Sequence, residues 1–287
     1  MDDRELLKVV TEIVGRENTM DDCAEVPCGD RLMVLTTDML HRTTDFEKGM
    51  SDWQIGWMSA AVSLSDIASM GAEPKHLLIA VGLDDWKHLG GIMQGTQDCC
   101  RKFGAQIIGG DIDHHEELTV VTTGIGLVDR DRIVRRTGAQ PGDLLCITGT
   151  PGQAQAFLDG YSQHEKALFE PQPRVEEGEL LGKSGVSAMM DDSDGIALSL
   201  YDLVSVNDCG FSLDSAKIPR PAGIPEDHAR ELALFGGGDY ELIFTLPPKH
   251  HPIKGVSYTI IGTTIQEKVV LLDGRPLEKR GYQHRWE

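Results

Sequence analysis

Two spacings of hydrophobic positions recur along the chain, one typical of helices and one of strands. In residues 3–15, Leu6, Leu7, Val10 and Val14 fall on one face of a predicted helix. In residues 52–70, apolar side chains again recur at helical spacing. There, Ser51 or Asp52 can cap the start and Gly71 can close the end. Both segments are therefore predicted to be helices, and the second one carries an aspartate, Asp66.

Short β-branched and apolar runs alternate with further helical segments. Strands are predicted at 32–36, 77–83, 105–108, 118–128, 144–148, 240–246, 258–265 and 269–272. Helices are predicted at 86–103, from the turn 149–152 to about residue 159, and at 174–183, 195–206 and 226–234. This alternation predicts an α/β or α+β fold. The turn-rich segment 138–143 divides the predicted elements into two domains, 1–137 and 138–287.

Composition narrows the range of partners. The formal net charge is −19 and no long basic block is present, so we expect neither a nucleic acid nor an anionic membrane as a partner. No apolar run approaches the 18 residues that a membrane span needs. Six cysteines without a C-x-x-C pair favour reduced thiols, and we therefore expect a cytoplasmic location.

Aspartates gather at the predicted strand ends. Asp38 follows one apolar stretch and Asp111 another, while MMDDSDG places Asp191 and Asp194 after a third. Ligand sites of α/β folds form at the ends of strands, and carboxylates that converge there repel one another unless hard cations lie between them. Oxygen ligands of this kind suit Mg²⁺ rather than zinc. Asp66 is expected to be buried, because its helix neighbours are apolar or small.

Phosphate contacts are less certain from the residues alone. The turn Gly149–Gly152 could offer backbone N–H groups to a phosphate, but it lacks the Gly-Lys-Ser/Thr of a Walker loop, and such turns are more often simple connections. The turn Gly236–Asp239 is open to the same two interpretations. Arg136 is our preferred phosphate contact among the arginines near the domain boundary. Together these residues favour Mg²⁺-assisted phosphoryl transfer from a nucleotide.

The same motifs resemble those of a known family. The segments that carry the resemblance are DDCA (21–24), TTD (36–38), AVSLSDIASMGAEP (61–74), IGGD (108–111), RRTGAQPGD (135–143), DDSDG (191–195) and FGGGDYELIFT (235–245). In this order they resemble thiamine-monophosphate kinase, and the match covers nearly the whole chain. SDIASMGAEP and GGGDYEL are shared with a wider group that includes aminoimidazole ribonucleotide synthetase, selenophosphate synthetase and the hydrogenase-maturation dehydratase. D-x-SDG and the C-terminal Gly-Tyr-x-His favour the thiamine branch.

The resemblance implies a two-domain fold like that of aminoimidazole ribonucleotide synthetase. It also implies a homodimer whose N-terminal sheets form a shared barrel, and direct transfer of the γ-phosphate of ATP to thiamine monophosphate. The implied metal ligands for several Mg²⁺ ions are Asp22, Thr36, Thr37, Asp38, Asp66, Asp111, Asp191 and Asp194. The implied ATP contacts are Gly110, Asp111, Arg136 and Ser193, and the implied catalytic residues are Asp66, Asp111 and Asp194. Asp192 is expected to point away from the site and carry no chemistry.

The implied acceptor side departs from the family pattern. The implied substrate positions are Asp45, Gly238 and Tyr282. Asp45 stands where the family has a substrate-contacting histidine, and Gly238 stands where it has a glutamate. Asp45 could still attract the cationic thiazolium or the pyrimidine, and Tyr282 either stacks on thiamine or only packs. Two alternatives therefore remain: another ATP-dependent synthetase or dehydratase of the wider group, and a non-catalytic nucleotide-binding homologue.

Overall fold

The computed structural model describes residues 1–284 and residue 286, and this part of the chain contains two β-sheets. The first half holds α1 (Asp3–Val14), β1 (Ala24–Cys28), β2 (Arg31–His41), α2 (Asp52–Ser69), β3 (Glu73–Leu83), α3 (Leu89–Lys102), β4 (Gln106–His114) and β5 (Thr119–Asp129). The second half holds β6 (Leu144–Thr148), α4 (Gln153–Leu158), α5 (Glu165–Phe169), α6 (Val175–Gly182), β7 (Ala188–Asp192), α7 (Ile196–Val206), β8 (Gly210–Leu213), α8 (Glu226–Phe235), β9 (Glu241–Leu246), β10 (Tyr258–Ile265), β11 (Val270–Leu272) and β12 (Arg275–Pro276). The predicted mixed α/β class is confirmed.

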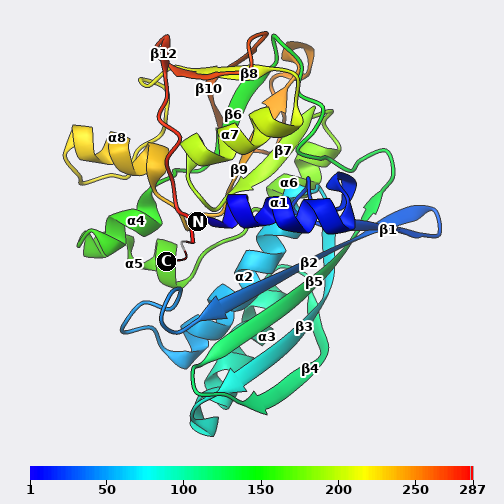
Figure 1. Ribbon diagram of the computed structural model, residues 1–287, viewed down its shortest axis with the longest axis vertical. Helices are drawn as coiled ribbons and strands as arrows, with labels where there is room; N and C mark the ends of the chain where they lie inside the picture. Colours follow the sequence, from blue (N-terminus) through cyan, green and yellow to red (C-terminus); the bar gives the residue numbers. More distant parts are fainter. Residues whose placement is uncertain (285, 287) are drawn as a thin grey trace.

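The first sheet has the order β1-β2-β5-β3-β4, with helices on one face only. Helices α2 and α3 lie behind this sheet in Figure 1, and the face toward the viewer carries no helix. Burial alternates along β2 and β5 accordingly: Leu32 and Val34 pack under α2, whereas Met39 on the opposite face is 59% exposed. One side of the sheet is therefore core and the other is open.

Helix α2 is the central element of the first half. It begins with a capping box in which Ser51 and Gln54 satisfy each other's backbone N–H groups. It lies directly on the glycines of β5, because a Cβ at Gly124 would come within 2.9 Å of the Ile67 side chain. This close approach brings the polar residues of α2 within hydrogen-bond reach of β2.

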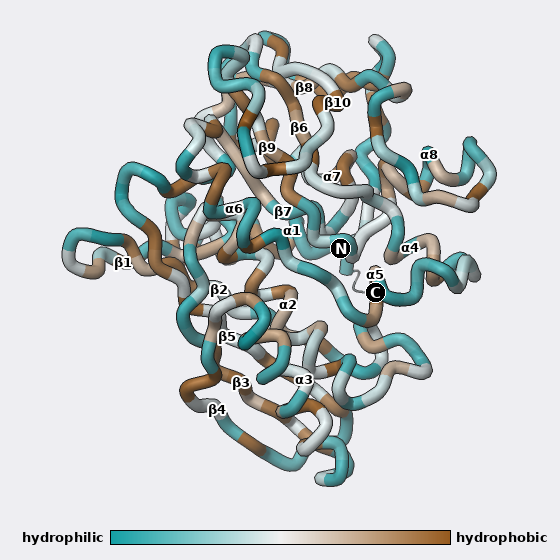
Figure 2. The backbone as a smooth tube through the Cα atoms, turned by 180° about the vertical axis from the view of Figure 1, so that it is seen from behind, coloured by the Kyte–Doolittle hydropathy of each residue, from teal (hydrophilic) through white to brown (hydrophobic). Residues whose placement is uncertain are grey.

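The second sheet has the order β12-β11-β8-β10-β6-β9-β7. Its central strands are almost entirely buried, and Figure 2 shows hydrophobic colouring along β6 and β10. The segment 130–143, which contains the predicted boundary at 137/138, connects the two sheets. The edge strand β7 contacts α2, so this edge of the second sheet lies beside the first half of the chain.

Two predicted strand ends are wrong. Asp38 does not end its strand, because β2 continues to His41 and pairs with β5 along its whole length. Asp111 likewise lies inside β4, which continues to His114 beside β3. Asp111 lies on the open face, where alternation tolerates polar residues, whereas Asp38 faces α2 and accepts a hydrogen bond from Ser63. Polarity therefore did not mark a strand end in either case. The sequence analysis did not predict the strands β1, β7, β8 and β12 or the helix α5.

The two ends of the chain meet. Met1 and Trp286 exchange two backbone hydrogen bonds of 3.0 and 3.3 Å, and the N and C marks lie close together in Figures 1 and 2.

Within the described part of the chain, every helix is too short or too polar to cross a membrane. The six cysteines are free thiols.

Candidate active site

Three aspartates from distant parts of the chain converge where the two halves meet. Asp22 lies just before β1, Asp66 lies on α2, and Asp191 lies near the end of β7. One carboxylate oxygen of each lies within 4.8 Å of those of the other two. We call these three residues the aspartate cluster.

Hydroxyl groups orient each carboxylate of the aspartate cluster. The donors are Ser69 to Asp22 at 2.6 Å, Ser65 to Asp191 at 2.9 Å, and Thr36 to Asp66. Both serines lie on α2, and Ser69 shares a helix face with Asp66 and with Ser65 because residues three or four apart do so. The motif SLSDIAS therefore supplies one carboxylate and holds two others.

Burial and mutual repulsion disfavour the ionised form of the cluster. Burial raises the pKa of Asp66 well above its usual value, and the nearby charges of Asp38 and Asp191 raise it further. Burial and the charge of Asp22 raise the pKa of Asp191 to about 8. A divalent cation would remove this penalty, so the donor set and its electrostatics fit Mg²⁺.

The TTD motif is divided between the two faces of the first sheet. Asp38 faces α2 and accepts a hydrogen bond of 2.6 Å from Ser63. Thr37 points to the open face, where its hydroxyl lies 3.0 Å from that of Thr123. The structure therefore brings Thr36 and Asp38 to the side of the aspartate cluster and leaves Thr37 on the other side.

Arg136 lies beside the cluster. Its Nε donates a hydrogen bond of 2.9 Å to Asp22, and its backbone N–H donates one of 2.6 Å to Asp21. These bonds hold the guanidinium beside the aspartate cluster, where phosphate oxygens would also bind. This placement suits the predicted phosphate contact.

The DDSDG motif turns from β7 into α7 with alternating side-chain directions. Asp191 joins the cluster, whereas Asp192 points away and accepts a hydrogen bond of 3.0 Å from Ser199, as expected. Ser193 accepts a hydrogen bond of 2.7 Å from the N–H of Gly238 through its carbonyl. Asp194 forms an ion pair of 2.8 Å with Arg4 of α1.

Two cavities meet at Ser193 and Asp194. One, of about 310 Å³, is lined by Arg136, Arg4, Met20 and Met190 together with these two residues. The other, of about 260 Å³, is lined by these two residues, Asp38, Asp66 and Asp191. Two ligands could thus reach Ser193 and Asp194 from different sides.

The three predicted acceptor residues line the second cavity. Asp45, Gly238 and Tyr282 face it together with apolar side chains, which are Leu40, Met58, Val62, Leu158, Leu168 and Tyr240. Asp45 accepts hydrogen bonds of 2.7 Å on Oδ2 from the His41 N–H and the Thr44 hydroxyl. Both of these bonds end on Oδ2, so they leave the lone pairs of Oδ1 unused.

Gly110 and Asp111 lie away from the aspartate cluster. Both belong to β4, three strands from Asp38 in the first sheet. Neighbouring strands are about 4.8 Å apart, so Asp111 and Asp38 are separated by roughly 14 Å. Asp111 is exposed and points to the open face, because its β3 partner is Ala80, next to the buried Ile79.

The two glycine-rich turns have a structural role in α4. The Asp239 carboxylate accepts hydrogen bonds of 2.5, 2.9 and 2.9 Å from the first N–H groups of α4, at Gly152, Gln153 and Ala154. These donors are therefore not free for a phosphate, which favours the simple-connection interpretation of Gly149–Gly152. The turn Gly236–Asp239 both caps α4 and places Gly238 in the second cavity.

Sequence reasoning missed two charged contacts of the site. Arg4 reaches Asp194 from α1, and Arg174 forms a two-bond ion pair with the buried Glu241 at 2.5 and 2.6 Å. Neither arginine lies in a segment with a distinctive local pattern. Their partners are distant in sequence, so only the tertiary structure identifies them.

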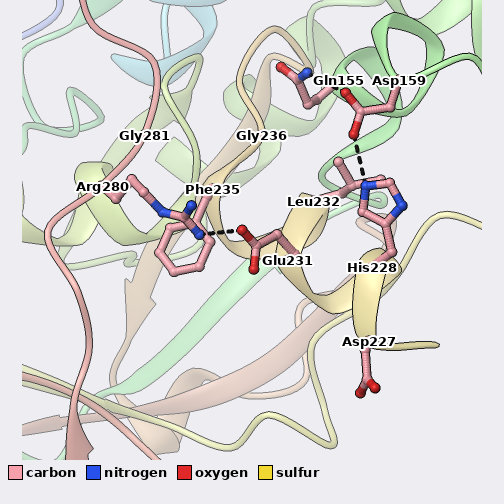
Figure 3. Close-up of a pocket in the computed structure, with 10 residues that line it drawn as sticks. All are labelled: Gln155, Asp159, Asp227, His228, Glu231, Leu232, Phe235, Gly236, Arg280 and Gly281. Atoms are coloured by element: carbon pink, nitrogen blue, oxygen red, sulfur yellow. Dashed lines mark hydrogen bonds and ion pairs between the residues drawn. The ribbon is translucent and has the colours of Figure 1, made fainter. Parts of the chain in front are cut away.

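A third cavity, of about 590 Å³, lies between α4, α8 and the C-terminal segment, and Figure 3 shows its lining. Arg280 lies over the ring of Phe235 and pairs with Glu231 at 2.5 Å, while His228 pairs with Asp159 at 2.8 Å. These side chains are directed at one another rather than at a common point. None of the predicted site residues lines this cavity.

Comparisons with known proteins agree with this site. The model of the AIR synthase related protein, N-terminal domain, matches residues 20–128. Thiamine-monophosphate kinase of Methanospirillum hungatei is 46% identical over the full length of both chains, and that of Halobacterium salinarum is 39% identical over 99% of this chain and 100% of its own.

Solved structures share the fold. The structure of AaThiL complexed with AMPPCP and TMP matches with a TM-score of 0.91 and 24% identity, over 99% of this chain and 97% of that one. Thiamine-monophosphate kinase from Stenotrophomonas maltophilia matches with a TM-score of 0.82 and 26% identity, over 95% and 96%. Identity over the full length, the shared fold and the convergent aspartates lead to one conclusion: the chain belongs to the thiamine-monophosphate kinase family.

Proposed function

We propose that the protein transfers the γ-phosphate of ATP to the phosphate of thiamine monophosphate, which yields thiamine diphosphate and ADP. The observation that carries this proposal is the pair of cavities that meet at Ser193 and Asp194 beside the aspartate cluster. Two phosphorylated substrates need two sites and one shared point of transfer. The names of the relatives, and the ATP analogue in the AaThiL complex, support the same reaction.

Mg²⁺ fits the aspartate cluster. Its three carboxylates are close together, buried and oriented by hydroxyl groups, so they supply oxygen ligands that only a cation can neutralise. Asp22, Asp66 and Asp191 would hold Mg²⁺ there, and the bound ion would supply positive charge to offset the negative charge of the phosphates during transfer. Asp38 and Thr36 stand beside the cluster and complete the predicted ligand set on this side of the sheet.

The first cavity suits the nucleotide. Arg136 and Ser193 line it, and both are predicted ATP contacts. The guanidinium of Arg136 can donate two parallel hydrogen bonds to phosphate oxygens once cations neutralise Asp22. Catalysis then depends on holding the two phosphates in line, and the protein forms no covalent bond with either substrate.

The second cavity suits the thiamine group. Its walls combine the Tyr240 and Tyr282 residues with aliphatic and methionine side chains, and Asp45 is one of the carboxylates that line it. Thiamine has flat rings and a positive charge, so aromatic side chains and one carboxylate match its chemistry. Asp45 thus replaces the family's histidine with a group of suitable charge, while Gly238 contributes only space.

We also propose a homodimer formed by the open face of the first sheet. This face exposes large apolar side chains, with Val26 42%, Met39 59% and Leu78 37% exposed. If the open faces of two copies packed against each other, the apolar side chains of both copies would be buried. Thr37 and Asp111 point to the same face, so Asp111 would reach Thr37 across the dimer rather than within one chain. The predicted domains, 1–137 and 138–287, would then be a dimerising half and an outer half.

One assay tests the function. The protein is incubated with Mg-ATP and thiamine monophosphate, and thiamine diphosphate and ADP are measured by chromatography. Equal amounts of the two products are expected, with none when EDTA replaces Mg²⁺ or when thiamine replaces thiamine monophosphate. Tight ATP binding without product would favour a non-catalytic homologue. ADP formed only with another acceptor would favour a different reaction of the wider group.

A further inference from the structure

Arg4 is shared by two carboxylates of the second half of the chain. Its terminal Nη2 donates a hydrogen bond of 2.8 Å to Asp194 and one of 2.6 Å to Asp202, and its Nε donates to Asp202 at 3.0 and 3.1 Å. The Arg4 side chain is only 18% exposed. The reaction as described above does not use this residue.

Both ends of the chain hold Asp194. Arg4, in the first turn of α1, binds its side chain, and the N–H of Tyr282 donates a hydrogen bond of 3.0 Å to its carbonyl. The two ends are themselves joined by the bonds between Met1 and Trp286. The position of Asp194 therefore depends on α1 and on the C-terminal segment together.

Helix α1 has little apolar burial to hold it. No residue of the helix is buried, and its apolar side chains are largely open, with Val10 46% and Ile13 78% exposed. Much of its attachment therefore comes from the polar contacts of Arg4. An element with few buried apolar contacts shifts at low energetic cost when such a contact changes.

We propose that Arg4 is a positioning residue that neutralises and orients Asp194 until a divalent cation replaces it there. The inference rests on the proposed function, because it takes Asp194 as a cation ligand. The guanidinium and a divalent cation carry charge of the same sign and need the same carboxylate oxygen, so they compete. Asp202 keeps Arg4 at the site after the exchange, since it holds the guanidinium by two donor atoms.

Two substitutions should change cation affinity in opposite directions. Arg4→Gln removes the competitor and should tighten Mn²⁺ binding by roughly tenfold, the scale of a partly buried, hydrogen-bonded ion pair. Asp202→Asn removes the two-donor partner of Arg4, leaves Asp194 and the more distant Asp3 as its carboxylate partners, and should weaken Mn²⁺ binding. Arg16→Gln is the matched control, because Arg16 bonds only to the Ser205 carbonyl from the same end of the chain.

The experiment titrates the full chain with Mn²⁺ alone and measures free Mn²⁺ by electron paramagnetic resonance. Circular dichroism checks that each variant is folded. If Arg4→Gln fails to fold, Asp202→Asn decides the matter. Unchanged affinity in both variants, weaker binding in Arg4→Gln, or no Mn²⁺ binding by the parent protein would overturn the inference. Failure of the proposed function would instead appear as absence of thiamine diphosphate from the parent enzyme, whatever the Mn²⁺ titration gives.

Discussion

The carboxylates of Asp66 and Asp191 have oxygens within 4.8 Å of each other, although one lies on a helix of the first half and the other on a strand of the second. Burial raises the pKa of both carboxyl groups, and the charge of Asp191 raises the pKa of Asp66 further. The two halves of the chain thus create an unfavourable electrostatic contact where they meet. A bound cation converts this contact into a binding site, and the following predictions depend on that relationship.

Asp66→Asn should abolish turnover, with a loss of at least about 100-fold, because it removes the central ligand of the aspartate cluster. The same change should raise the melting temperature of the metal-free protein, since it relieves repulsion with Asp38 and Asp191. Asp131→Asn, at an exposed position, is the control for both measurements. Full activity in Asp66→Asn would refute the metal assignment.

The metal-free protein should lose stability from the cluster as pH rises. The pKa of Asp191 is about 8 in the folded protein and 3.8 in the reference state, so folding favours the protonated form. The contribution of Asp191 to the stability of the folded protein is complete below about pH 3.8, and it is lost as pH rises toward 8. The melting temperature of Asp191→Asn relative to the parent should therefore increase between pH 5 and pH 8. Mg²⁺ should stabilise the parent more at pH 8 than at pH 5, and a difference of the opposite sign would contradict this account.

Gly124→Ala should destabilise the protein by about 1–3 kcal/mol, because the new methyl group would press on α2. A Cβ at this position comes within 2.9 Å of Ile67 and 3.2 Å of Ser63. Gly90→Ala, in α3 with open space around it, should instead stabilise by about 0.5–1 kcal/mol. Urea denaturation of both variants checks the contrast. Equal effects would mean that the contact between α2 and β5 is less tight than described.

Asp45→Asn and Tyr282→Ala should raise the KM for thiamine monophosphate by roughly tenfold, the value of one lost charged or aromatic contact. The KM for ATP should stay within about twofold, because neither residue lines the cavity assigned to the nucleotide. Steady-state kinetics with each substrate varied in turn provides the measurement. A rise in the KM for ATP alone would exchange the two cavity assignments.

Mixed dimers should reveal whether Asp111 acts across the interface. A dimer of one Asp66→Asn chain and one Asp111→Asn chain has one site with both changes and one with neither, if Asp111 is supplied by the second copy. Such dimers, purified with two different affinity tags, should keep about half of the parent activity, since one of two sites is intact. Inactive mixed dimers would place Asp111 in the site of its own chain.

Met39→Asp on the open face should give monomers in light scattering.

The sequence by itself determined the class of the fold and most of its elements. The helix at 52–70 was predictable because its apolar spacing and the cap at Ser51 are local features. The carboxylates that we propose as Mg²⁺ ligands were identifiable from the sequence because residue type and motif are local features. In contrast, Asp111 on the open sheet face and Asp38, which bonds to Ser63 of α2, both looked like strand ends.

Only the tertiary structure decided which of these residues meet. Asp22, Asp66 and Asp191 converge because α2 lies against the glycines of β5 and beside β7, and no local pattern reports such packing. The tertiary structure also places Thr37 and Thr36 on opposite faces of the sheet. It puts Asp111 three strands from Asp38 and brings Arg4 to Asp194. Local spacing fixes the direction of a side chain along its own element, whereas the distance between elements depends on long-range packing.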